Sequence, residues 1–116
     1  LNKLGLSQFI NTKFMSLSSG FKKRVSIARA LIKNPDIFLF DEITASLDKT
    51  SKKQIIETII DLRVGRENKV IMWATHDVDE ALNICNKIIL LKEGTISLII
   101  NKGDKEFNEE YISKFL

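Results

Sequence analysis

The stretch Ile37–Asp48, IFLFDEITASLD, places four apolar residues directly before two carboxylates. An apolar run this short, preceded by the turn-forming residues 34–36, predicts a buried strand of a parallel sheet. Asp41 and Glu42 then stand at the carboxyl end of that strand. Because ligands bind at this end of the strands in open α/β sheets, we expect both acids to serve chemistry and not packing.

The segments on either side of this strand predict a layered α/β fold. Upstream, apolar residues recur with helical spacing from Phe21 to Ile32, and this helix should stop at Asn34-Pro35. Downstream, a second helix is expected between residues 48 and 65, followed by a buried strand over residues 70–75. Strands alternating with helices through right-handed crossovers are typical of a mostly parallel sheet.

The remaining segments are expected to complete one domain or part of one. Residues 1–14 fit a short helix followed by a loop, and another short helix should start at Asp77. Two apolar runs flanking Glu93-Gly94 predict a hairpin, and a last helix is expected over residues 104–116. No internal repeat, low-complexity tract or linker interrupts the sequence.

Composition excludes several classes of protein. Of the 116 residues 44% are hydrophobic and 28% charged, as in globular proteins, and no apolar run is long enough to span a membrane. The net charge of +3 is too small to argue for nucleic-acid binding, and the basic cluster Lys22–Arg24 is interpreted as a solvated helix face. Cys85 is the single cysteine, which fits a reducing cytosol. We therefore expect a soluble, cytoplasmic chain.

Three groups of residues point to phosphate chemistry. In phosphoryl transfer one carboxylate holds Mg²⁺ while another group orients the attacking water, and Asp41 and Glu42 can divide these roles. Ser18 and Gly20 open a helix whose free amides and dipole favour an anion, although Ser18 read alone is an ordinary helix cap. His76, the only histidine, ends the second apolar run and is expected at the same sheet edge, where we favour contact with a γ-phosphate over a structural role.

The segments LSSGF, KKRVSIARAL, NPDIFLFDE, TASLD and ATHD resemble, in order and spacing, the pattern of ATP-binding-cassette (ABC) transporter ATPases. LSSGF resembles the family signature LSGGQ, IFLFDE resembles the Walker B strand, and ASLD resembles the D-loop. His76 resembles the switch histidine. The resemblance runs from about Leu4 to Ile96 and implies a three-layer P-loop NTPase fold.

The resemblance implies a role for each matching residue at a dimer interface. Ser18 and Gly20 would contact the γ-phosphate of an ATP molecule held by the opposite subunit of a head-to-tail dimer. His76 would contact the γ-phosphate as well. Asp48 would link the two nucleotide sites across the dimer interface.

The resemblance also implies a reaction and a place in the cell. Asp41 would bind Mg²⁺ and Glu42 would act on the attacking water, so the cofactors are ATP and Mg²⁺. The chain would belong to an ATP-hydrolysing subunit that couples hydrolysis to transport. Its partners would be a second ATP-binding subunit, identical or different, and a transmembrane permease subunit, with no nucleic acid. It would lie in the cytoplasm, peripheral to the inner face of the cell membrane.

The signature-like segment departs from the family pattern at two positions. Ser19 stands where the family usually has its second glycine, and Phe21 stands where it usually has glutamine. The first change removes backbone freedom near the phosphate, and the second removes the hydrogen bonds of an amide. We expect the function of this segment to be weakened or altered.

A larger departure is the absence of a G-x-x-x-x-G-K-[ST] phosphate loop and of a glutamine loop before the signature. We therefore interpret residues 1–116 as the carboxyl-terminal part of an ABC-type ATP-binding domain that is truncated, split or a remnant, and we expect it to be inactive alone. In the family the phosphate-loop strand lies beside the His76 strand. Val70–Ala74 should then form an apolar edge that recruits another chain or aggregates.

Two alternatives compete with the transporter ATPase. A degenerate, non-catalytic cassette that acts as an interaction module is favoured by the missing phosphate loop. It is opposed by the retention of Asp41, Glu42, Asp48 and His76. An ATPase of the same superfamily that acts on nucleic acid is disfavoured by the modest charge and the lack of a stripe of stacking aromatic residues.

Overall fold

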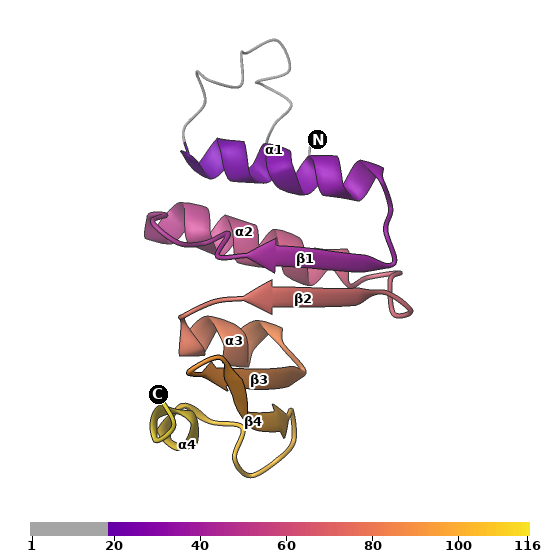
Figure 1. Cartoon of the computed structure of the whole chain (residues 1–116). Helices are drawn as coiled ribbons and strands as arrows, with labels where there is room; N and C mark the ends of the chain where they lie inside the picture. Colours follow the sequence, from indigo (N-terminus) through magenta and orange to yellow (C-terminus); the bar gives the residue numbers. More distant parts are fainter. Residues whose placement is uncertain (1–18) are drawn as a thin grey trace. The chain divides into compact units, whose positions relative to one another are not determined.

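The computed structural model describes residues 19–116, which belong to two compact units. The first unit ends at Ala74 and the second begins at Thr75. None of the helices in the described range is long and apolar enough to cross a membrane. The elements of the first unit are labelled in Figure 1: α1 (Ser19–Ile32), β1 (Ile37–Asp41), α2 (Lys49–Leu62) and β2 (Val70–Ala74).

Strands β1 and β2 form a two-stranded parallel sheet. Ile37 lies opposite Val70 and Asp41 lies opposite Ala74, so the two strands start and end together. The short apolar runs predict both strands, and the structure confirms them. The prediction that they are buried strands is wrong for one face of the sheet, because that face has no cover in the described unit. Within residues 19–116, β2 pairs with β1 only, so its other edge carries unpaired backbone groups, as the sequence predicts.

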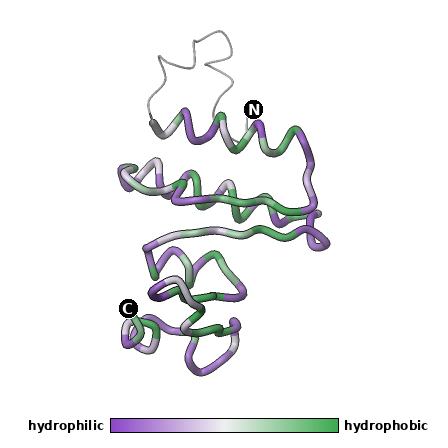
Figure 2. The backbone as a smooth tube through the Cα atoms, viewed as in Figure 1, coloured by the Kyte–Doolittle hydropathy of each residue, from purple (hydrophilic) through white to green (hydrophobic). Residues whose placement is uncertain are grey.

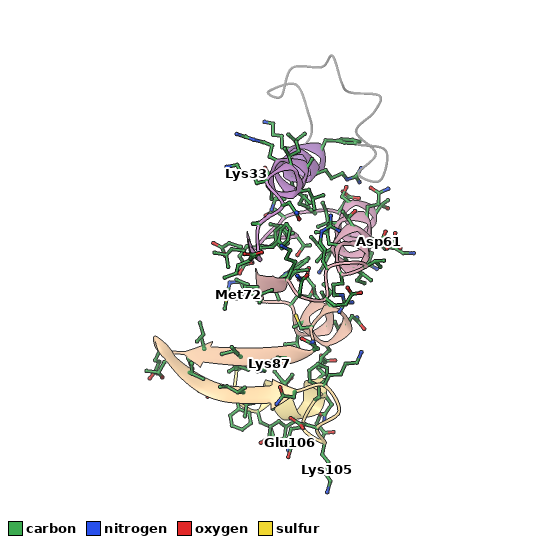
Figure 3. The ribbon with its side chains drawn as sticks, turned by 90° about the vertical axis from the view of Figure 1, so that its right-hand side faces the viewer. Lys33, Asp61, Met72, Lys87, Lys105 and Glu106 are labelled. Carbon is green, nitrogen blue, oxygen red and sulfur yellow. The ribbon has the colours of Figure 1, made fainter. Side chains whose placement is uncertain are left out.

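One face of this sheet contributes to the core of the first unit. Phe38 and Phe40 are buried, with ring centroids 6.1 Å apart. Trp73 packs edge-on against Phe40 at 6.1 Å, and Figures 1 and 3 show α2 alongside the strands. The helices supply the other buried apolar side chains of the unit, which are Ile27, Ile55, Ile59 and Leu62.

The opposite face of the same sheet is apolar but exposed. Ile37 and Leu39 alternate with buried residues of β1, Val70 and Met72 alternate with half-buried residues of β2, and all four are exposed. Figure 3 shows Met72 on the side of the strands that faces away from α2. Parallel sheets are normally covered on both faces. This exposed row, which we call the open sheet face, therefore has the composition of a core surface without a cover in the described unit.

The boundaries of α1 and α2 follow local signals in the sequence. α1 ends at Ile32, and Asn34 then takes a left-handed conformation (φ 44°) directly before Pro35. α2 starts after Asp48, whose carboxylate accepts a hydrogen bond from the backbone N–H of Ser51 at 3.2 Å. α2 ends at Leu62, slightly before the expected stop at residue 65, because the backbone then closes short turns through residues 63–66.

The second unit combines two short helices with an antiparallel hairpin. Glu93 and Gly94 both have positive φ (50° and 76°), as a two-residue type I′ turn requires, and the predicted hairpin is confirmed. Its core is formed by the buried residues Leu90, Ile100 and Ile112. The elements of the unit are α3 (Val78–Ile84), β3 (Lys87–Lys92), β4 (Thr95–Asn101) and α4 (Glu109–Ser113).

The last helix is much shorter than the sequence suggests, because α4 covers only Glu109–Ser113 and not residues 104–116. Asp104 accepts a hydrogen bond from the backbone N–H of Asn101 at 2.7 Å, so it closes a turn after β4. Asn108 then caps α4 by accepting the N–H of Tyr111 at 2.8 Å. These side-chain hydrogen bonds favour a loop over a longer helix.

The α/β fold class is confirmed, and the described strands form part of the expected sheet. They are arranged as one parallel pair and one antiparallel pair. The segment 1–14, for which a helix and loop are expected, lies outside the described residues.

Candidate functional site

The two acids of the predicted site lie at the carboxyl end of β1. Asp41 is the last residue of the strand and is exposed, and Glu42 follows it with a left-handed backbone (φ 52°). The N–H of Glu42 donates to the carbonyl of Ala74 at 2.9 Å, which fastens this turn to the end of β2. Figure 2 shows the hydrophobic colour of β1 giving way to hydrophilic colour at this end. The structure therefore places both residues at the carboxyl end of β1, and the direction and roles of their carboxylates stay predictions.

The role of Asp41 as a magnesium ligand stays a prediction, with which its exposed position at a strand end is compatible. Mg²⁺ in nucleotide sites is usually held by one or two carboxylates together with phosphate oxygens and water. An exposed carboxylate at a strand end fits this pattern. Within residues 19–116 no group of three or more His, Cys, Asp or Glu side chains could hold a metal ion by itself.

A short turn joins the acids to α2. The N–H of Ala45 donates to the carbonyl of Glu42 at 3.1 Å, and Ser46 has a left-handed backbone (φ 64°). Lys23 of α1 reaches the same turn, because its Nζ donates to the carbonyls of Glu42 at 3.1 Å and Ala45 at 3.2 Å. The turn is therefore fixed from its own backbone and from a neighbouring helix.

Lys23 and Arg24 of the basic cluster do not belong to a solvated helix face, so the sequence interpretation is wrong for these two residues. Lys23 hydrogen-bonds to the turn after β1, and the guanidinium of Arg24 is buried and lies over the ring of Phe21 at 4.8 Å. Burial lowers the pKa of Arg24, against the opposing effect of the Asp48 carboxylate. Helical spacing alone does not reveal the contact of Lys23, because the turn that it reaches is about twenty residues away in the sequence.

Asp48, the predicted dimer-interface residue, is exposed and caps α2. Its pKa lies below the ordinary value because the carboxylate accepts hydrogen bonds from Ser51, through the side chain and the backbone N–H. The carboxylate is therefore ionised at neutral pH and held in a fixed direction by the helix that it starts. A contact across a dimer interface stays a prediction.

Of the two predicted signature residues, Gly20 is described and Ser18 lies outside the described residues. Gly20 is buried in the first turn of α1. A Cβ atom at this position would come 3.2 Å from Oγ and 3.4 Å from Cβ of Ser51, so glycine allows α1 and α2 to approach closely. This packing explains the glycine locally, and its contact with a phosphate stays a prediction.

His76 opens the second unit and is exposed. It borders an open depression of about 520 Å³ whose lining also includes Asp77 and Glu109. His76 follows Ala74 by two residues in the chain, and the carbonyl of Ala74 accepts the backbone N–H of Glu42. Because His76 and the acids belong to different units, their convergence on one phosphate stays a prediction.

A hydrogen-bond network that the sequence interpretation missed surrounds His76. Thr75 donates its hydroxyl to the carboxylate of Glu80 and accepts the N–H of Asp77 at 3.0 Å. Asp77 in turn accepts the N–H of Glu80 at 3.1 Å and caps α3, as predicted. The network fixes the backbone on both sides of His76. Its signal in the sequence is the Asp-x-x-Glu spacing, which is typical of a capped helix start.

Glu80→Ala is expected to destabilise the chain by about 1–3 kcal/mol, because it leaves the hydroxyl of Thr75 without its buried acceptor. Glu80 is only 2% exposed, so water cannot readily replace the lost carboxylate. Urea unfolding followed by circular dichroism measures the change. Glu80→Gln keeps an acceptor oxygen and should lose less, while Glu57→Ala on the exposed side of α2 should be nearly neutral. Equal losses for Glu80→Ala and Glu57→Ala would contradict the role of the network.

The comparisons with known proteins agree with the fold and with the family that the sequence resembles. The sequence model of the ABC transporter family matches residues 1–45, a segment that includes Gly20, Asp41 and Glu42. Solved ABC ATP-binding domains share the fold of this chain. In sequence and in fold the chain is thus similar to part of the ATP-binding proteins of ABC transporters.

Three relatives illustrate the likeness. The chain is 38% identical over 118 residues to the glycine betaine transport ATP-binding protein OpuAA of Bacillus subtilis, covering 100% of this chain and 28% of OpuAA. It resembles cbiO1 of Clostridium perfringens, part of the transporter complex cbiONQ, with a TM-score of 0.80 and 29% identity, covering 99% of this chain and 45% of that one. It resembles the ATP-binding cassette MJ0796, a dimer bound to ADP and Pi in a post-hydrolysis state, with a TM-score of 0.73 and 33% identity. This likeness covers 86% of this chain and 44% of MJ0796. The chain spans less than half the length of each relative.

Proposed function

We propose that this chain forms part of an ATP-hydrolysing subunit of an ABC transporter and that the subunit couples hydrolysis to transport across a membrane. The observation that carries the proposal is the pair Asp41 and Glu42 at the carboxyl end of a parallel strand, tied to the end of the neighbouring strand through Ala74. Ligands bind at this edge in open α/β sheets. Similarity to this family supports ATP as the ligand.

In this proposal Glu42 orients the water molecule that attacks the γ-phosphate and accepts its proton. Asp41 holds Mg²⁺, whose positive charge offsets the charge of the phosphates. His76 donates a hydrogen bond to the γ-phosphate from the start of the second unit. Asp41 ends β1, Glu42 follows it, and His76 comes two residues after the end of β2.

The same proposal places other residues at the interface of a head-to-tail dimer. Ser18 and Gly20 contact the γ-phosphate of the ATP held by the opposite subunit, and Asp48 connects the two nucleotide sites. The dimeric state of the relative MJ0796 supports this arrangement. The membership of cbiO1 in a transporter complex supports a transmembrane permease as the second partner, with the ATPase peripheral to the inner face of the membrane.

The phosphate loop, which the 116 residues lack, would come from a segment outside this chain. The open sheet face and the unpaired edge of β2 support such a partner, because both are surfaces that a complete parallel sheet buries. The segment could be continuous with this chain or belong to another polypeptide.

The test is to mix the chain with a polypeptide that carries the phosphate-loop half of a related cassette and to measure release of phosphate from Mg-ATP. We expect background turnover for either part alone and clear turnover for the mixture. Nucleotide-independent binding of the two parts without turnover would contradict the ATPase and support a non-catalytic interaction module. The missing phosphate loop is the observation that keeps this second candidate open.

A further inference from the structure

Lys23 connects α1 to the turn that carries Glu42, a contact that neither the residue type nor its helical spacing predicts. Its Nζ lies 3.1 Å from the carbonyl oxygen of Glu42 and 3.2 Å from that of Ala45. An ammonium group has three donors, and hydrogen bonds from a charged donor are stronger than neutral ones. A single side chain therefore holds two carbonyls of one turn.

The turn has a backbone that needs such support. Glu42 and Ser46 have φ values of 52° and 64°, in the left-handed region that residues other than glycine rarely adopt. The carbonyl of Glu42 accepts both the N–H of Ala45 at 3.1 Å and the ammonium of Lys23. Loss of the ammonium would remove the charged donor from two carbonyls of the turn and weaken its resistance to relaxation toward ordinary backbone angles, although the hydrogen bond from Glu42 to Ala74 remains.

The direction of the Glu42 carboxylate depends on this backbone conformation. The carboxylate leaves the chain at the same residue whose φ is unusual and whose carbonyl Lys23 holds. Lys23 also lies one helical turn after Gly20 in α1, so a displacement of that end of α1 would be carried to the carbonyls of Glu42 and Ala45.

We propose that Lys23 is a positioning residue: it fixes the left-handed turn that aims Glu42 at the attacking water, and it couples the amino-terminal end of α1 to that carboxylate. The inference rests on the proposed function, since it gives Lys23 a part in the same reaction. Lys23 itself touches backbone carbonyls and is not assigned a contact with substrate.

The experiment compares Lys23→Met, which keeps the alkyl chain and removes the charged donor, with Lys33→Met, which makes the same change at an exposed residue after α1. Two quantities are measured: amide hydrogen exchange of Ala45 and Leu47 in the chain without ATP, and kcat and KM for Mg-ATP in the mixture with the phosphate-loop polypeptide. Lys23→Arg retains a charged donor and serves as the conservative variant.

For Lys23→Met we expect exchange at Ala45 and Leu47 to rise about tenfold, as loss of a charged hydrogen bond implies. We expect kcat to fall roughly 10-fold to 100-fold with KM little changed, because misplacement of a reacting group affects the chemical step. Lys23→Arg should show smaller changes in both amide exchange and kcat than Lys23→Met. Lys33→Met should match the unsubstituted chain in both quantities.

Unchanged exchange in Lys23→Met would overturn the contact, and faster exchange with unchanged kcat would overturn the positioning role. A fall in kcat shared by Lys33→Met would also overturn it, since the effect would then belong to net charge. If the unsubstituted mixture shows no turnover, the proposed function fails and the positioning role fails with it. The exchange measurement, which needs no ATP, would still report separately on the contact.

Discussion

Glu42→Gln is expected to reduce ATP turnover by a factor of about 10² to 10⁴ in the mixture of this chain with a phosphate-loop polypeptide, the range typical for loss of a general base. Glutamine preserves the size of the side chain and one acceptor oxygen, but it cannot take a proton from water. Because the backbone of Glu42 is held by Ala74 and by Lys23, the substitution should leave the turn in place. The loss should therefore fall on kcat, and KM should change little.

Steady-state phosphate release over a range of Mg-ATP concentrations measures this loss. Glu57→Gln provides the matched control, because Glu57 is an exposed glutamate of α2 and the change in charge is the same. Nucleotide binding to the Glu42→Gln mixture should persist. Turnover within a factor of two of the unsubstituted mixture would show that Glu42 is not the base, and it would shift the balance toward a cassette that binds partners without hydrolysis.

The parts of the fold that the sequence predicts correctly are those set by local pattern. Four apolar residues before Asp41 predict a strand, and the glycine of Glu93-Gly94 between two apolar runs predicts a two-residue hairpin turn; the structure has both. Asp77 is the predicted start of α3, and of Ser46 and Asp48, which can both cap α2, the structure has Asp48, because a cap acts within a single helical turn. Local signals of this kind do not depend on the rest of the chain.

The parts that the sequence misses depend on distant or competing contacts. Lys23 looks like any lysine on a helix, and only folding brings it to the carbonyls of Glu42 and Ala45. The helix expected over residues 104–116 is interrupted because Asp104 and Asn108 satisfy backbone groups with their side chains. Periodicity counts apolar positions and carries no information on either effect.

The second large expected effect concerns stability, because neighbouring residues of β1 lie on opposite faces of the sheet, one buried and one exposed. Phe38 is 2% exposed and Leu39 is 72% exposed. In the chain alone, Phe38→Ala should cost about 3–5 kcal/mol of unfolding free energy, as for other buried aromatic residues. Leu39→Ala should cost less than about 0.5 kcal/mol, as for an exposed position. Urea unfolding of the two variants measures the difference.

Substitution of Leu39, which should have little effect in the chain alone, should have a large effect on binding of the phosphate-loop polypeptide. If that polypeptide covers the open sheet face, Leu39 becomes a core residue of the joined sheet, and Leu39→Ala should then weaken association by about 2–5 kcal/mol, the cost of truncating a buried leucine. Met72, opposite Leu39 in the register, should behave in the same way. Titration calorimetry of each variant with the polypeptide gives the affinities. If Leu39→Ala and Phe38→Ala lower the unfolding free energy of the chain alone by the same amount, the open sheet face is already covered in that chain. Unchanged affinity in Leu39→Ala would mean that the polypeptide binds elsewhere.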